Sequence, residues 1–295
     1  MSRAIEKFLH FLSVNRAASG NTVAAYRNDL QQLANYVDGC LPRQARSRWH
    51  AVEREMIEDF ILDLRGRGYK ESSVARKVAA ARSFFAFLSG ERIIPTDPTQ
   101  GLSLPRVAKI SPTEISPDEL DQLLEQPAGR GTPEAKRDQA MLELLSATGM
   151  RVSELVSLDV SDLQLDRKPF VRCPATGIAR RRIPIRDEAV TALRVYLVEA
   201  RPLLVGRSKM PPLFVNRRGD HLTRQGVWFI LKGYADSAGV DHGVSPQTLR
   251  RSFAARMLHG GMPLAMVQKM LGHANVSTTR VYLNSAGDKI AASSG

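Results

Sequence analysis

A proline-rich stretch without helical periodicity, residues 94–117, divides the chain into two unequal parts. Its prolines include Pro95, Pro98, Pro105 and Pro112. Proline removes a backbone donor and disfavours the helical conformation in the residue before it, so this stretch predicts an extended linker. We place the boundary within residues 104–112 and predict two domains, 1–108 and 109–295, in a chain long enough to bury sizeable cores.

The part before the linker is predicted to be all helical, because apolar residues recur at intervals of three and four. These repeats are Ile5, Phe8, Leu9 and Leu12; Val23, Tyr26, Leu30 and Leu33; Met56, Ile57, Phe60, Ile61 and Leu64; and Val74, Val78, Phe84, Phe85 and Leu88. The last predicted helix, residues 72–89, carries Arg76, Lys77 and Arg82 on its polar side. That side is either a solvated face or a set of contacts to a nucleic-acid backbone.

Helix signals also mark the start of the second part. Ser116 and Glu119 form a capping box in which the serine caps the helix and the glutamate lies three residues on. A later helix is predicted to end at Gly149, and Arg151 follows that turn directly. The guanidinium of Arg151 either pairs with Glu154 or points into a functional site.

One short region of the second part is strand-like. Residues 170–173 and 182–185 are partly alternating and predict a small hairpin or sheet edge. Helices are predicted again at 188–198 and 223–238. In the latter, Trp228, Phe229 and Leu231 are predicted to be core residues rather than a platform for base stacking. The predicted fold class is therefore mainly α with a small β-sheet.

Residues 245–282 contain the densest helix punctuation in the chain. Ser245 can cap a helix whose first residue is Pro246, since proline lacks the N–H that would be left unpaired there. Gly260 and Gly261 are predicted to end that helix. Gly272 fits the left-handed position after the next helix, and that turn presents the following residue at the helix exit.

The same stretch carries side chains that a phosphodiester reaction can use. Gln247 and Arg250 lie three residues apart and can point from the first turn into one site. His273 follows the glycine turn, and Tyr282 comes after residues 277–279, a Ser-Thr-Thr run that could cap another short helix.

The charge of the chain favours a polyanionic partner. The formal net charge is +12 and the pI is near 10.1. Residues 1–109 hold 17 Lys+Arg against 11 Asp+Glu, and the rest of the chain hold 25 against 19. Because Lys and Arg neutralise phosphates, both parts are predicted to bind nucleic acid, although the same charge could simply keep the surface soluble.

Other features of the sequence limit the possible location and cofactors. Cys40 and Cys173 are the only cysteines and lie in no metal-binding spacing, which indicates a reducing compartment and no metal site. No apolar run approaches the ~18–20 residues of a membrane span, and the first residues lack a signal core. We therefore expect a cytoplasmic, nucleoid-associated protein without a membrane contact.

Four motifs in order resemble the tyrosine recombinases, most closely their Xer-like branch. T-G-M-R-V-S-E-L is similar to the first arginine motif, and L-R-R-S-F-A-A-R to the second. L-G-H-A-N-V-S-T-T is similar to the histidine motif, and R-V-Y carries the nucleophile position. N-T-V-A-A-Y-R-N-D-L and G-Y-K-E-S-S-V-A-R-K resemble the helical core-binding domain, so the resemblance covers nearly the whole chain.

The resemblance implies a helical core-binding domain and a mixed α+β catalytic domain that together form a C-shaped clamp on duplex DNA. Tyr282 would attack a scissile phosphate and form a 3′-phosphotyrosyl bond, without metal, ATP or another cofactor. Arg151 and Arg250 would hold the non-bridging oxygens, and His273 would hydrogen-bond the phosphate or assist the tyrosine proton. The implied partners are double-stranded DNA with a specific core site and a homo-tetramer or a partner recombinase.

Two positions depart from the family pattern. Thr176 aligns where the family usually has a lysine that protonates the leaving 5′-oxygen, and Gln247 stands where histidine is usual. Thr176 is either a DNA contact or an ordinary turn residue. Arg180 and Arg181 could supply charge to DNA, but arginine hardly gives up a proton. A missing general acid slows such chemistry by roughly 10²–10⁴-fold, so a slow recombinase is expected unless another group delivers the proton.

Two other functions remain open from the sequence. A catalytically weakened DNA-binding partner of another recombinase would retain the clamp without cutting efficiently. An enzyme that relaxes supercoils as a monomer would use the same tyrosine chemistry without joining two duplexes.

Overall fold

A computed structural model describes residues 2–16, 18–42, 44, 49–102, 115–174, 180–205, 211–240, 243–273 and 275–282. The chain separates into two compact units, Met1–Ile110 and Ser111–Gly295. The predicted domain boundary between 108 and 109 lies outside the described residues, and it remains a prediction.

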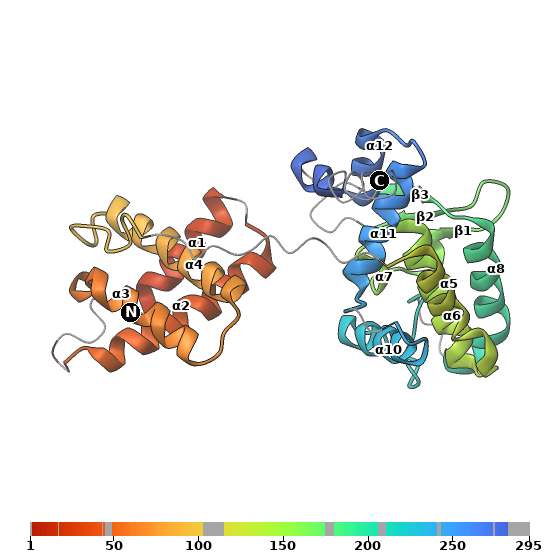
Figure 1. Ribbon diagram of the computed structural model, residues 1–295, viewed down its shortest axis with the longest axis horizontal. Coiled ribbons are helices and arrows are strands. Elements are labelled where there is room, and N and C mark those ends of the chain that lie inside the picture. Colours follow the sequence, from red (N-terminus) through yellow and green to blue (C-terminus); the bar gives the residue numbers. More distant parts are fainter. Residues whose placement is uncertain are drawn as a thin grey trace, which may run out of the picture. The chain divides into compact units, whose positions relative to one another are not determined.

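The first unit consists of helices (Figure 1), and aromatic side chains lie in the core between them. Its elements are α1 (Ser2–Asn15), α2 (Gly20–Cys40), the short 3₁₀ helix η1 (Trp49–Ala51), α3 (Arg54–Gly66) and α4 (Glu71–Gly90). Phe84 is fully buried in the centre, with the rings of Trp49 and Phe8 at 4.8 and 5.5 Å in edge contacts. Each helix turns the apolar residues predicted for it toward the inside of the unit, and together these residues form one core.

Lys77 corrects one prediction about α4. Its side chain is 3% exposed, and its ammonium donates to Asp29 Oδ1 at 3.0 Å and to Gln32 Oε1 at 2.8 Å on α2. Lys77 therefore does not lie on the exposed polar side of the helix, and the prediction that it contacts DNA is wrong for this arrangement. The physical reason is the buried carboxylate of Asp29, which makes an inward-facing lysine favourable because a buried charge needs a partner.

The second unit is mostly helical, with one small sheet, as predicted for the fold class (Figure 1). In chain order its elements are α5 (Pro117–Glu125), η2 (Ala128–Arg130), α6 (Pro133–Thr148), α7 (Val152–Leu155), η3 (Val160–Asp162), β1 (Leu163–Gln164), β2 (Phe170–Cys173), β3 (Arg181–Pro184), α8 (Asp187–Val195), the π-helical η4 (Tyr196–Ala200), α9 (Arg201–Val205), α10 (Arg224–Ser237), α11 (Pro246–His259) and α12 (Leu264–Leu271). Residues 276–282 are also helical.

The sheet is antiparallel, in the order β1-β2-β3. The predicted hairpin is confirmed, with Cys173 opposite Arg181 and Val171 opposite Ile183. The second strand starts one residue earlier than predicted, and β1 was not predicted because two residues carry no periodic signal. The earlier start places Arg181 inside the strand.

Helix α6 is the centre of the second core. It is buried nearly all round and packs against α8 and α11, and its buried residues include the charged side chains of Arg137, Asp138 and Glu143 as well as apolar ones (Figure 1). The capping box at Ser116 is confirmed, since Glu119 N–H donates to Ser116 Oγ at 3.2 Å and Ser116 N–H to Glu119 Oε2 at 2.8 Å.

Trp228 was expected in this core, and that prediction is wrong. Its side chain on α10 is 40% exposed and meets the exposed ring of Phe229 at 5.2 Å. The buried face of the helix is formed instead by Val227, Leu231 and Tyr234. Among the described residues, no helix is both long and apolar enough to cross a bilayer.

Candidate active site

Arg250 occupies the buried centre of the candidate site. Ser245 caps α11 as predicted, accepting from Thr248 N–H at 3.2 Å, so Arg250 lies in the second turn of the helix. Only 2% of the residue is exposed, and its guanidinium donates to the carbonyls of Gly149 and Leu271, both at 2.6 Å. Burial, and next the neighbouring charge of Arg151, lower its pKa to about 10, so the group remains a cation at neutral pH.

Arg151 reaches the same place from another part of the sequence. Gly149 ends α6 in the left-handed region at φ 58°, and Arg151 immediately precedes α7. Its Nη2 donates to the carbonyl of Gly272 at 3.0 Å, while Nη1 lies 3.3 Å from Glu154 Oε1. Arg151 therefore combines the two predicted alternatives, since it pairs with Glu154 and also lies in the candidate site.

Arg181 departs from its predicted role. It is buried, and its Nη1 and Nη2 donate to the two carboxylate oxygens of Glu154 at 2.8 and 2.9 Å. Its Nε donates to the carbonyl of Met270 at 2.6 Å. The prediction that Arg181 contacts DNA is wrong here, because the pleat of β3 turns this side chain inward with Ile183.

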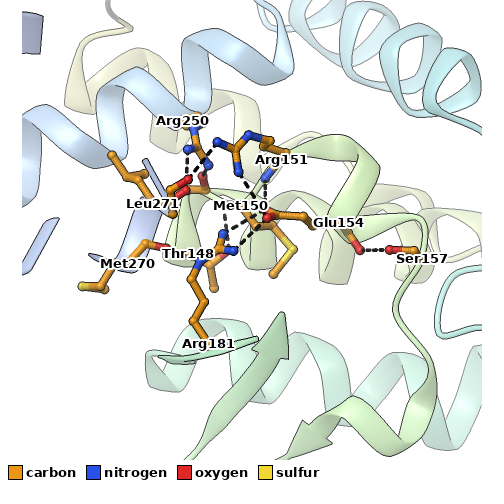
Figure 2. A network of polar contacts seen from close by, with 11 residues as sticks. Thr148, Met150, Arg151, Glu154, Ser157, Arg181, Arg250, Met270 and Leu271 are labelled. Carbon is orange, nitrogen blue, oxygen red and sulfur yellow. Dashed lines mark hydrogen bonds and ion pairs between the residues drawn. The ribbon is translucent and has the colours of Figure 1, made fainter. Parts of the chain in front are cut away.

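Figure 2 shows the three guanidinium groups converging on the end of α12. Three consecutive carbonyls there each accept from a different arginine, namely Met270 from Arg181, Leu271 from Arg250 and Gly272 from Arg151. The carbonyl end of a helix carries partial negative charge, which favours cations in this position.

His273 leaves α12 through the predicted glycine turn. Gly272 has φ 64°, and the His273 N–H donates to the carbonyl of Gln268 at 3.1 Å. The imidazole Nδ1 lies 2.9 Å from Thr279 Oγ1 in the helical segment 276–282. Burial, followed by the charges of Arg250 and Arg151, lowers the pKa of His273 to about 4, so the ring is neutral at pH 7.

Tyr282 lies beside this histidine. The two rings are nearly parallel, with centroids 6.1 Å apart and planes at 27°. Tyr282 is 5% exposed and belongs to a cluster with Phe253, Val267 and Leu271. The Ser-Thr-Thr run expected to cap this segment lies inside the helix instead, where Thr279 holds His273.

The remaining predicted site residues are more scattered. Gln247 is exposed in the first turn of α11, three residues before Arg250, and Thr176 lies outside the described residues. Arg180 is exposed next to the start of β3. In the first unit, Arg82 is exposed on α4, and Arg76 pairs with Asp29.

The assembled groups suit an anion. Arg151 and Arg181 pair with one buried carboxylate, that of Glu154, and Arg250 is a third guanidinium cation nearby, so the cluster carries an excess of positive charge. Within the described ranges, no three His, Cys, Asp or Glu side chains gather in a way that could hold a metal ion. The arrangement can therefore bind a phosphate beside an imidazole and a phenol.

The sequence reasoning missed two contributors. The sequence indicates Glu154 only as a partner of Arg151, whereas its carboxylate also accepts from both Nη groups of Arg181. The sequence predicts Thr279 in a helix cap, whereas its hydroxyl contacts the His273 ring. The alternation of Arg181 with Ile183 and Ile185 was a usable signal, since residues two apart in a strand share a face.

The chain matches two known protein families, one in each of its two parts. Residues 5–92 match the Phage integrase, N-terminal SAM-like domain, and residues 113–288 match the Phage integrase family. Tyrosine recombinase XerC of Herpetosiphon aurantiacus is 45% identical over 289 residues, which are 98% of this chain and 92% of the relative. Tyrosine recombinase XerD of Halalkalibacterium halodurans is 43% identical over 279 residues, 94% and 91% of the two chains.

Solved structures share the fold. The XerH site-specific recombinase bound to palindromic difH substrate in a post-cleavage complex gives a TM-score of 0.75 at 19% identity, over 99% of this chain and 94% of that one. A lambda integrase dimer bound to a COC′ core site gives a TM-score of 0.72 at 17% identity, over 96% and 94%.

Proposed function

The chain belongs to the phage integrase family and is a tyrosine recombinase, and we propose that it cleaves and rejoins duplex DNA at a specific core site with Tyr282 as the nucleophile. The observation that supports this assignment is the convergence of Arg151, Arg250 and His273 on the end of α12, beside Tyr282. Arg151 comes from a part of the sequence about 100 residues before the stretch that carries the other three, and a structural role alone requires no such gathering.

In the proposed reaction, the phenol oxygen of Tyr282 attacks the scissile phosphate. A P–O bond to tyrosine forms while the bond to the 5′-oxygen breaks, so the phenol loses a proton and the leaving oxygen gains one. The resulting 3′-phosphotyrosyl ester preserves the energy of the phosphodiester. Attack by a 5′-hydroxyl of a second duplex then rejoins the strands and releases Tyr282, with no requirement for ATP or a metal.

The arginines and the histidine stabilise the phosphate in this scheme. Each named contact of Arg151 and Arg250 uses only part of a guanidinium that has five N–H donors, so donors remain for the non-bridging oxygens. A phosphodiester carries one negative charge and its pentavalent transition state two, so the excess positive charge favours the transition state. Because Nδ1 of His273 is engaged by Thr279, we assign Nε2 to the phosphate.

Two residues of the chain are proposed to limit the rate of DNA cleavage. Thr176 stands where the family usually has the general-acid lysine, and Gln247 can donate a hydrogen bond but cannot shuttle a proton. We therefore expect slow cleavage, by roughly 10²–10⁴-fold relative to a site with a general acid. Introducing that acid as Thr176→Lys should increase the cleavage rate.

The proposed partners follow from charge and family. Both predicted domains, 1–108 and 109–295, are basic and would close on duplex DNA as a clamp, with Arg82 and Arg180 contacting the backbone. Exchange between two duplexes requires four active sites, which a homo-tetramer or a pair with a partner recombinase would supply. A DNA substrate of this kind implies a nucleoid-associated, cytoplasmic protein.

The test uses a duplex that the protein selects from a random-sequence library, with a nick that traps the covalent intermediate. Wild type is expected to give a protein–DNA adduct that survives denaturant, and Tyr282→Phe to bind the same duplex without an adduct. Tight binding by wild type with no adduct, even after long incubation, would instead assign the chain as an architectural partner. Products that contain DNA from only one parent duplex would favour relaxation of supercoils over recombination.

A further inference from the structure

We infer that Arg181 is a positioning residue for the phosphate-binding site, an inference that rests on the proposed function. Its side chain points inward from β3 and is 7% exposed. A charged residue of this size is rarely buried without a specific partner. All three of its guanidinium nitrogens donate, in two directions. Its position therefore suits a link between elements better than a contact with DNA.

The first direction leads to Arg151 through Glu154. Arg181 binds both carboxylate oxygens of Glu154, which is fully buried. The same two oxygens accept from Arg151, its backbone N–H at 2.7 Å and its Nη1 at 3.3 Å. The orientation of Glu154 thus fixes the start of α7 and one end of the Arg151 guanidinium, and Arg181 fixes Glu154.

The second direction leads to the end of α12. The Arg181 Nε contact with the Met270 carbonyl is one residue from the Arg250 contact and two from the Arg151 contact. A Cβ on Gly272 would come within 3.0 Å of Arg181 Nη1, so the turn that presents His273 packs directly against this guanidinium. Arg181 therefore joins β3, α7 and the end of α12 in one network (Figure 2).

Arginine is required for this task because of its shape. The planar fork binds a carboxylate with two parallel bonds while Nε donates elsewhere, whereas the single nitrogen of lysine cannot reach Glu154 and Met270 in the same geometry. Lysine would keep the charge that Glu154 needs. Arg181→Lys therefore separates the positioning role from charge and from the cost of an unpaired buried carboxylate.

The experiment compares Arg181→Lys with Arg137→Lys as a matched control. Arg137 is also buried, pairs with the neighbouring carboxylate of Asp138 at 2.7 Å and donates to a backbone carbonyl, that of Val215, at 3.0 Å, but it lies outside this network. Both variants are measured for duplex affinity and for single-turnover cleavage of the nicked duplex. Nitrogen-15 NMR of the DNA-free protein measures rotation of the Arg151 guanidinium about its Nε–Cζ bond.

For Arg181→Lys we expect unchanged duplex affinity, cleavage slower by about 10²-fold, and faster rotation of the Arg151 guanidinium. Arg137→Lys should leave cleavage and rotation as in wild type. Adding Glu154→Gln to Arg181→Lys should slow cleavage little beyond the slower single variant, because both act through one carboxylate.

The inference would be overturned if Arg181→Lys cleaves DNA at the wild-type rate and its Arg151 guanidinium rotates as in wild type. Multiplied losses in the double variant would also overturn it. Failure of wild type to form an adduct would instead contradict the proposed function, while the NMR comparison would still test the network.

Discussion

At the scale of single residues, the candidate site places cations close together and keeps its histidine neutral. Arg250 remains charged although burial and Arg151 lower its pKa to about 10. A histidine of ordinary pKa changes charge near neutral pH. The lowered pKa of His273 keeps its imidazole neutral there. Its neutral state lets it hydrogen-bond a phosphate without adding to the repulsion among Arg151, Arg181 and Arg250.

We expect His273 in the DNA-free protein to titrate near pH 4, well below its usual 6.5. Between about pH 6.5 and about pH 4 the unfolded chain binds a proton that the folded protein does not, so the free energy of unfolding falls as the pH falls through this window. Histidine-selective NMR measures the pKa directly. Urea unfolding at about pH 7 and about pH 4.5 should show a smaller pH dependence for His273→Gln than for wild type. An imidazole that titrates at its ordinary pKa would contradict the prediction.

At the scale of elements, glycine turns determine where the site arginines lie. Gly149 ends α6 at φ 58°, two residues before Arg151, and α11 packs close to this turn. A Cβ on Gly149 would lie 2.4 Å from Phe253 Cδ1, a distance that requires the ring or its helix to move. Phe253 lies on α11 three residues after Arg250, so strain at this turn reaches the site directly.

Gly149→Ala should therefore lower the free energy of unfolding of the second unit by more than backbone strain alone would. Gly131 is a matched control, since it has a similar φ of 64° but a Cβ there would meet nothing within 4 Å. We expect Gly131→Ala to reduce the free energy of unfolding by about 1–2 kcal/mol from the left-handed backbone. In Gly149→Ala, overpacking against Phe253 should reduce the free energy of unfolding by a further amount of about 1–3 kcal/mol. Equal losses in the two variants, measured by urea unfolding, would show that the contact with Phe253 relaxes without cost.

Much of this local structure could be predicted, because caps and glycine turns depend on neighbouring residues. Ser116, Ser245 and Gly272 adopt the predicted roles for that reason. Lys77 and Arg181 did not, since each pairs with a carboxylate far away in the sequence, 48 and 27 residues respectively. Burial of a charge depends on where its partner folds, and periodicity within one element does not contain that information.

At the scale of the whole molecule, the division into two compact units suggests two separate folding reactions. The units are Met1–Ile110 and Ser111–Gly295, and each has its own apolar core. The sequence contains two tryptophans, Trp49 in the first unit and Trp228 in the second. Each is a natural fluorescence reporter for one unit, in variants where the other is replaced by phenylalanine.

We expect urea unfolding to show that each unit responds only to its own substitutions. Lys77→Ala leaves the buried Asp29 without its buried cation, so the transition followed by Trp49 should lose about 3 kcal/mol while that of Trp228 stays in place. Gly149→Ala should shift only the transition followed by Trp228, because Phe253 belongs to the second unit. Separate shifts would show that the two units unfold independently of each other. If both reporters shift together in either variant, the two units unfold as one and the expectation is wrong.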